Sequence, residues 1–158
     1  MSSLLKYSEF ADSEFDSPEV YQTHGTVTQK ILPKEYEEVK AALAYLAVLE
    51  DNWNGYASKA PTEGSIDATL AFFKSFYLNR PYPNNIAPDG DGAIMLIWLT
   101  DNSKIVITVE PGLLHPAIEY VDGRNEFPMA IPYDLGTIPA EILKIIPERR
   151  PNAATPAR

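Results

Sequence analysis

Two carboxylates stand two residues apart in the run Asp89-Gly90-Asp91-Gly92. Carboxylate oxygens bind hard cations such as Ca²⁺ and Mg²⁺, and a glycine-rich loop allows both side chains to turn toward one ion. A full calcium-binding loop needs a further Asp or Asn two positions on and a Glu near its end. Here position 93 is Ala and the next Glu is Glu110. The pattern is therefore more typical of a turn, and a metal site at Asp89 and Asp91 is the weaker alternative.

Paired carboxylates for catalysis are a second hypothesis, because Glu50 and Asp51 precede a loop and could face the Asp89 turn. The chain has no cysteine, which excludes thiol nucleophiles, thiolate zinc sites and iron–sulfur clusters. His24 and His115 are its only imidazoles, and it has neither a Gly-x-Ser-x-Gly nor a glycine-rich phosphate-binding motif. We therefore expect no catalytic residues and no cofactor. A small carboxylate- or metal-dependent enzyme or ligand-binding protein is the alternative.

Aromatic and acidic side chains are interleaved in the first 24 residues. Such a segment either folds onto the core of its own domain or stays mobile and docks into a groove of a partner. Burial of the aromatic rings favours the protein's own core, whereas the acids among them suit a basic partner. The partner-binding residues that we predict in this segment are Tyr7, Glu9, Phe10, Asp12, Glu14, Phe15 and Asp16.

A second group of partner-binding candidates stands in the run Trp53-Asn54-Gly55-Tyr56. Trp and Tyr dominate the hot spots of protein interfaces, so Trp53 and Tyr56, with Asn54 between them, are predicted to take part in recognition. Packing of Trp53 under the loop is the competing interpretation. Trp98 stands within a predicted strand and is expected in the core.

Two amphipathic helices position these residues. Apolar residues recur at three- and four-residue steps from Tyr36 onward, which predicts a helix over about residues 34–50. Thr62 follows Pro61 and is typical of an N-cap, which predicts a second helix that stops before Pro81. The Trp53 run is thus the connection between two helices.

After the helices, the apolar period changes to that of strands, over residues 93–99, 104–110, 117–121 and 127–131. The short connections require antiparallel neighbours and predict a meander. The first strand is apolar on both faces, so it is expected to be central or covered on both sides. Pro128 marks the last as an edge strand. A short helix is predicted over residues 139–146.

The predicted fold class is α+β: a curved antiparallel sheet of four to five strands in meander order, with two helices packed on one face and a short C-terminal helix. A chain of 158 residues with 45% hydrophobic content is long enough to build one core without disulfides or a structural metal. We expect a single domain over residues 1–146. Residues 147–158 are rich in Pro, Arg and Asn and are expected to form a disordered tail.

Two motifs resemble a known family. The run Leu49-Glu50-Asp51-Asn52-Trp53-Asn54-Gly55 and the run from Pro88 to Trp98, with Pro61 between them, are similar to a family of small uncharacterised bacterial proteins. Its members have a Trp-x-Gly loop after a helix and an Asp-Gly turn that leads into a strand ending in Trp. The resemblance spans about residues 43–110. This chain departs from the family pattern after Gly55, where it has Tyr56-Ala57-Ser58 in place of a second glycine-like step. The resemblance implies no activity, but it implies a bacterial or phage setting and a helix–loop–helix–sheet unit.

Charge narrows the class of partner. The formal net charge is −9 and the pI is near 4.6, so the protein repels nucleic acids and anionic membranes and attracts basic proteins. No apolar run approaches the 18 residues of a membrane span, and the N-terminus lacks a secretory signal. We therefore expect a cytoplasmic protein that binds neither nucleic acid nor membrane.

The favoured prediction for function is a non-catalytic acidic protein-binding module that engages a basic partner, as an inhibitor, immunity factor or defence accessory does. Besides the enzyme or ligand-binding alternative, a homo-oligomeric structural protein is the third hypothesis, because an exposed sheet edge can pair with another copy.

Overall fold

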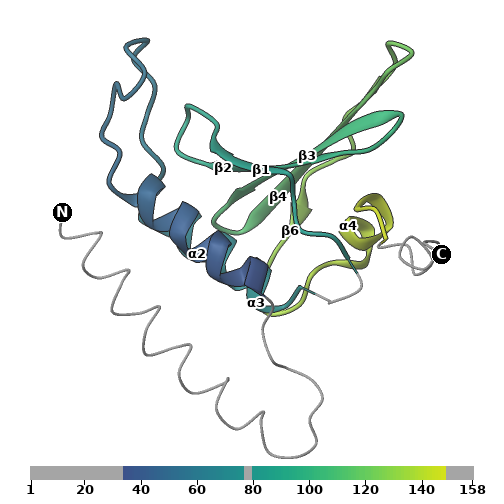
Figure 1. Cartoon of the computed structure of the whole chain (residues 1–158), viewed down its shortest axis with the longest axis horizontal. Helices are drawn as coiled ribbons and strands as arrows, with labels where there is room; N and C mark the ends of the chain where they lie inside the picture. Colours follow the sequence, from purple (N-terminus) through teal and green to yellow (C-terminus); the bar gives the residue numbers. More distant parts are fainter. Residues whose placement is uncertain (1–33, 77–79, 149–158) are drawn as a thin grey trace, which may run out of the picture.

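A computed structural model describes residues 34–76 and 80–148 of the chain. The predicted N-terminal binding residues, from Tyr7 to Asp16, lie outside the described residues, as do residues 149–158 of the predicted tail. The described residues form an α+β fold with three helices and an antiparallel sheet (Figure 1).

Both predicted helices are present, as α2 (Lys34–Ala47) and α3 (Glu63–Lys74). The apolar stripe that predicts α2 is buried, whereas its first turn carries exposed acids. The helix ends at Ala47 instead of about residue 50, because the backbone N–H groups of Val48 and Leu49 bond to carbonyls three residues back. This tightening ends the helix and starts the connection to α3.

Thr62 caps α3 as predicted. Its side-chain oxygen accepts a hydrogen bond from the Ser65 N–H at 3.0 Å, which satisfies a backbone donor at the helix start. The last helix, α4 (Ala140–Ile145), follows Pro139 and confirms the predicted short C-terminal helix. No helix among the described residues has both the length and the apolar character needed to cross a membrane.

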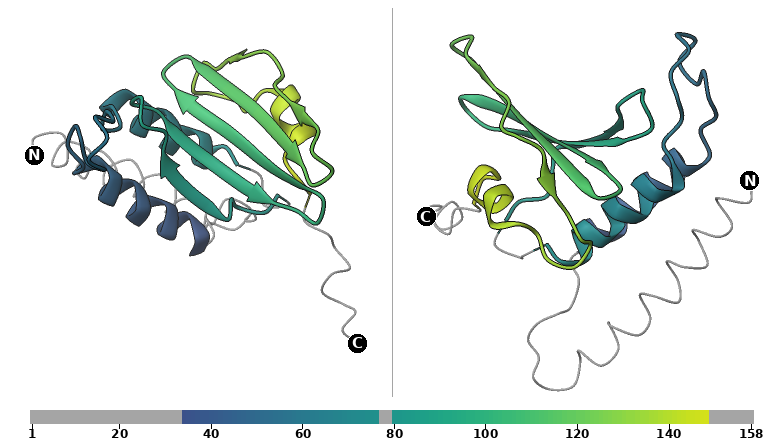
Figure 2. Two further views of the ribbon diagram at one scale, coloured as in Figure 1. Left: turned by 90° about the horizontal axis from the view of Figure 1, so that it is seen from above. Right: turned by 180° about the vertical axis from the view of Figure 1, so that it is seen from behind.

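The sheet has six strands, and every pair is antiparallel. Five of them follow the meander order β1-β2-β3-β4-β5, and β6 also pairs with β4 (Figure 2). The strands are β1 (Asn85–Pro88), β2 (Ile94–Leu99), β3 (Ser103–Glu110), β4 (Leu113–Tyr120), β5 (Asn125–Glu126) and β6 (Ile131–Pro132).

Three strand predictions need correction. The sequence prediction missed β1, and it started the third strand at residue 117, although β4 begins at Leu113 directly after a two-residue turn. The predicted strand over residues 127–131 is wrong, because β6 takes up only Ile131 of that range. Pro128 has no N–H to donate, and the exposed segment around it leaves the sheet between β5 and β6.

Helices α2 and α3 cover one face of the sheet (Figure 1). The side chains of Ile94, Leu96 and Ile107 point into this layer and are fully buried. Trp98 is buried as predicted, and its indole N–H donates to the Pro81 carbonyl at 2.8 Å. Burial of these side chains is the main driving force for the fold, and it fixes the sheet relative to both helices.

Candidate functional site

The connection between α2 and α3 is a compact loop held by its own side chains. The Asn52 N–H donates to the Ser58 carbonyl at 2.6 Å, and the Asn54 amide donates to the Ser58 hydroxyl at 2.9 Å. The indole N–H of Trp53 donates to the Lys59 carbonyl at 3.2 Å. Trp53 and Asn54 therefore help to shape the loop, which supports the packing interpretation of Trp53.

Three residues of this loop adopt left-handed backbone conformations, with φ of 66° at Asn52, 81° at Gly55 and 64° at Ala57. Asn tolerates this region, whereas Ala is strained there. The Ala57 N–H donates to the Asn52 side chain at 2.8 Å, which helps to hold the strained residue in place. Strained backbone conformations persist only where surrounding contacts hold them, so the hydrogen bonds of this loop give it a defined shape.

The loop is also tied to the turn that precedes β2. The Lys59 N–H donates to the Gly90 carbonyl at 2.8 Å, and the Thr62 N–H donates to the Gly92 carbonyl at 2.9 Å. A Cβ atom at Gly92 would lie 3.2 Å from the Thr62 methyl carbon, so a glycine suits this close approach. The structure thus brings together the Trp-Asn-Gly and Asp-Gly motifs, which lie far apart in the sequence.

Asp89, which begins the Asp-Gly motif, and Asp51, two residues before Trp53, both bond to backbone groups. Asp89 accepts from the N–H groups of Asp91 and Ala93 at 2.7 and 2.9 Å, and Asp51 accepts from the Ala60 N–H at 3.0 Å. These contacts are typical of turn-forming aspartates. Within the described residues, no group of three or more His, Asp or Glu side chains is placed to hold a metal ion.

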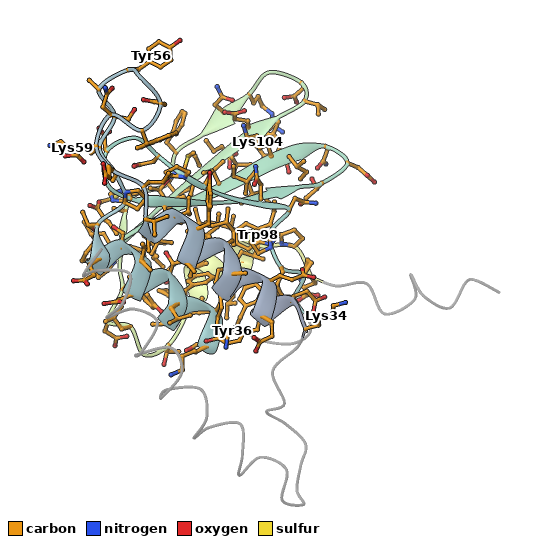
Figure 3. All side chains as sticks on the ribbon, turned by 60° about the vertical axis from the view of Figure 1, so that its left-hand side comes forward. Lys34, Tyr36, Tyr56, Lys59, Trp98 and Lys104 are labelled. Carbon is orange, nitrogen blue, oxygen red and sulfur yellow. The ribbon has the colours of Figure 1, made fainter. Side chains whose placement is uncertain are left out.

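Tyr56 stands at the tip of the loop, and its side chain points away from the domain (Figure 3). It is 84% exposed, and its N–H donates to the Asn54 side chain at 2.9 Å. The three binding candidates predicted in this loop therefore have different positions: Tyr56 is available for contact, whereas Trp53 is half-buried and Asn54 is bonded within the loop.

The β4–β5 turn is a second projection, which the sequence analysis did not single out. Val121 is 77% exposed there, and the Arg124 guanidinium lies 4.1 Å from the Tyr120 ring centre and pairs with Asp122 at 3.0 Å. The backbone N–H of Arg124, more than its guanidinium, holds the pKa of Asp122 below its usual value. The run Asp122-Gly123-Arg124-Asn125 predicts a connection between two strands here, but it does not predict that the turn projects from the sheet.

A further side-chain hydrogen bond joins His115 on β4 to Glu110 on β3. Both side chains are partly exposed and lie on the face of the sheet opposite the helices. The register between β3 and β4 brings these two side chains together, and the sequence alone does not predict that register.

A pocket of about 440 Å³ lies between α2 and the segment that leads into β1. Its lining includes the carboxylates of Glu35 and Glu38 and the apolar side chains of Val39 and Ile86. Neither carboxylate forms an ion pair within residues 34–76 and 80–148. The pocket is therefore an acidic concavity on the side of the domain where α2 faces the segment leading into β1.

No protein-family model matches the chain, and no curated protein or solved structure is significantly similar to it. The resemblance to the Trp-x-Gly family therefore stays a prediction.

Proposed function

We propose that this protein is a non-catalytic binding module that engages a basic protein partner, as an inhibitor, immunity factor or defence accessory does. The observation that carries this proposal is the exposed Tyr56 ring on a loop of defined backbone shape. A tyrosine held in this way loses little conformational freedom when it binds, so its burial adds directly to affinity.

The charge distribution supports a basic partner. The described residues contain 17 Asp and Glu against 8 Lys and Arg, so they carry a net charge of −9. A field of this sign speeds the approach of a basic protein and repels nucleic acids. Together with the absence of cysteine, it fits a protein of the bacterial cytoplasm.

Affinity capture on the immobilised full-length protein tests the proposal. We expect a basic partner to be retained at 50 mM salt and depleted at 500 mM salt, because ionic screening weakens charge attraction. Replacement of Tyr56 by Ala should lower retention at least about tenfold, as interface tyrosines do. The matched control is Tyr45→Ala, which removes another tyrosine, 68% exposed, from the surface of α2.

Two results would contradict the proposal: a captured partner that is acidic or insensitive to salt, or equal retention by the wild type and both variants. Neutralisation of Glu9, Asp12, Glu14 and Asp16 together tests the N-terminal prediction separately. Capture that depends on these four acids but not on Tyr56 would move the contact to the N-terminal segment.

A further inference from the structure

The face of the sheet opposite the helices carries a continuous apolar patch. The register places Ile97 of β2 beside Val106 of β3, and Val106 beside Ala117 of β4. Met95, two residues before Ile97 on β2, lies beside Ala87 of β1. All five side chains are partly exposed. We call these five residues the open face.

No described helix covers the open face, because α2, α3 and α4 all lie on the other side of the sheet (Figures 1 and 2). Strand β2 is central, between β1 and β3, yet Met95 and Ile97 have no layer above them in the described part of the chain. One face of an antiparallel sheet is often solvated, but it then carries polar side chains in alternation with the buried ones. Apolar side chains gathered on such a face are typical of a surface that binds a partner. The open face therefore has the character of an interface.

Two projections flank the open face. The Tyr56 loop and the β4–β5 turn both rise on this side of the sheet, at opposite ends of its strands (Figures 1 and 2). Tyr56 and Val121 are the most exposed apolar residues of these projections, at 84% and 77%. A partner that contacts Tyr56 is thus placed to reach the open face as well.

The edges of the sheet are poorly suited to an added strand. β1 has four residues and ends in Pro88, which cannot donate a backbone hydrogen bond. On the other side, β5 and β6 have two residues each, and Pro128 lies between them. Recognition through side chains on the open face is therefore favoured over pairing of backbones at an edge.

The net charge of the protein favours a different, basic protein over a second copy as the occupant of the open face. Each copy carries −9, so two copies repel each other, whereas a basic protein is attracted. Lys104 lies beside Glu119 at the margin of the open face, and Glu110 pairs with His115 at another margin, so the patch itself adds no strong positive charge. Figure 3 shows Lys104 on this side of the sheet.

We propose that the open face binds a segment of the basic partner in which apolar side chains are flanked by Lys or Arg. This inference rests on the proposed function and adds the second contact surface, next to Tyr56. The apolar side chains of the segment pack on Ile97 and Val106, and its cations lie near the carboxylates of Glu110 and Glu119 at the margins.

Methyl NMR of the full-length protein tests the docking surface with defined probes. The probes are an 18-residue Lys–Leu peptide patterned as an amphipathic helix, its sequence-scrambled form, and the corresponding Glu–Leu peptide. We expect the patterned Lys–Leu peptide to shift the methyl signals of Met95, Ile97 and Val106. It should bind at least about tenfold more tightly than the Glu–Leu peptide, because steering and apolar burial then act together.

A conservative variant separates apolar contact from charge. Joint replacement of Ile97 and Val106 by Thr keeps both residues β-branched and should weaken binding of the patterned peptide about fivefold or more, as apolar area is lost. The matched control is Val48→Thr, at a 42% exposed residue next to α2, and it should bind as the wild type does. An unchanged spectrum outside the replaced residues confirms that each variant is folded.

Several results would overturn the docking surface. Equal binding of the patterned and scrambled peptides would show attraction by charge alone. Methyl shifts confined to the pocket residues Val39, Ala42 and Ile86 would place the site at the pocket. Light scattering that reveals a dimer broken by the Thr variant would show that the occupant is a second copy. After either of the first two results, the proposed function would still hold if capture of a basic partner depended on salt and on Tyr56. If neither peptide binding nor capture occurred, both the proposed function and the docking surface would be wrong.

Discussion

The two faces of the sheet carry similar side chains in different surroundings. Ile107 on β3 points toward the helices and is fully buried, whereas Ile97 on β2 points to the other side and is partly exposed. Both are isoleucines in neighbouring strands, so intrinsic strand propensity does not distinguish them. The helix-covered face therefore builds the domain, whereas the open face has no helix over it among the described residues.

The largest expected effect comes from truncating one isoleucine on each face. We expect Ile107→Ala to lower the free energy of unfolding by about 3 kcal/mol, because it leaves a cavity in the core. Ile97→Ala should lower it by about 1 kcal/mol or less, since less area is lost from a partly exposed site. Urea denaturation measures both values. Equal losses would mean that the two faces are equally covered, and the comparison would fail.

A second test compares the projections that flank the open face. Gly92, under the Tyr56 loop, and Gly123, in the β4–β5 turn, have φ of +99° and +97°, but only Gly92 has a close neighbour, the Thr62 methyl carbon. We expect Gly92→Ala to destabilise by about 2 kcal/mol and Gly123→Ala by about 1 kcal/mol, because both are strained and one is also crowded. The same denaturation experiment measures the difference. Similar losses would show that the contact between loop and turn contributes little.

Sequence periodicity predicts the helices and central strands of the covered face well, but it predicts the edge of the sheet poorly. The α2 and α3 stripes and the alternation of β2 and β3 are strong patterns, and both helices and both strands are present as predicted. β1 escapes prediction because the run Asn85-Ile86-Ala87-Pro88 has one large apolar residue and a proline. Its place in the sheet depends on pairing with β2, which is a tertiary effect.

The candidate site is only partly readable from the sequence. Residue types make Tyr56 a candidate contact residue, but they do not show that Lys59 bonds to Gly90, some thirty positions away. Strand alternation separates Ile97 from Leu96 and Val106 from Ile107 within each strand. It does not show that Ile97 lies beside Val106, or that this face lacks a helix in the described part of the chain. Such information depends on how the layers assemble, and local patterns do not contain it.

A smaller effect is expected at a polar atom under the covered face. The buried Tyr133 hydroxyl has no hydrogen-bond partner among the described residues, and its ring centre lies 6.2 Å from that of Phe72. Because a buried, unpaired hydroxyl is unfavourable, Tyr133→Phe should raise the free energy of unfolding by about 1 kcal/mol. Thermal denaturation measures the gain, and a loss of stability would mean that the hydroxyl has a partner.

The same hydroxyl predicts a pH dependence. Burial, followed by the negative charge of Asp134, raises the pKa of Tyr133 to about 12. The unfolded state, with an ordinary tyrosine pKa of about 10, therefore releases its proton first as the pH rises. Stability should fall between these two values in the wild type, and the Tyr133→Phe variant should lack this contribution. A parallel decline in both proteins would assign the fall to other groups.

The smallest expected effect is the response to metal ions on the side of the open face. Asp89 accepts two backbone N–H groups in the turn below the Tyr56 loop. Among the described residues, no group of three or more His, Asp or Glu side chains is placed to hold the several oxygen ligands that a cation requires. We expect millimolar Mg²⁺, Ca²⁺ or Mn²⁺ to leave the melting temperature unchanged, with Asp91→Asn as the matched variant. A bound ion at a hundred times its Kd would stabilise the fold by about 2.7 kcal/mol, which a thermal scan resolves easily. A shift of that size, lost in Asp91→Asn, would favour the metal-dependent alternative over a binding module.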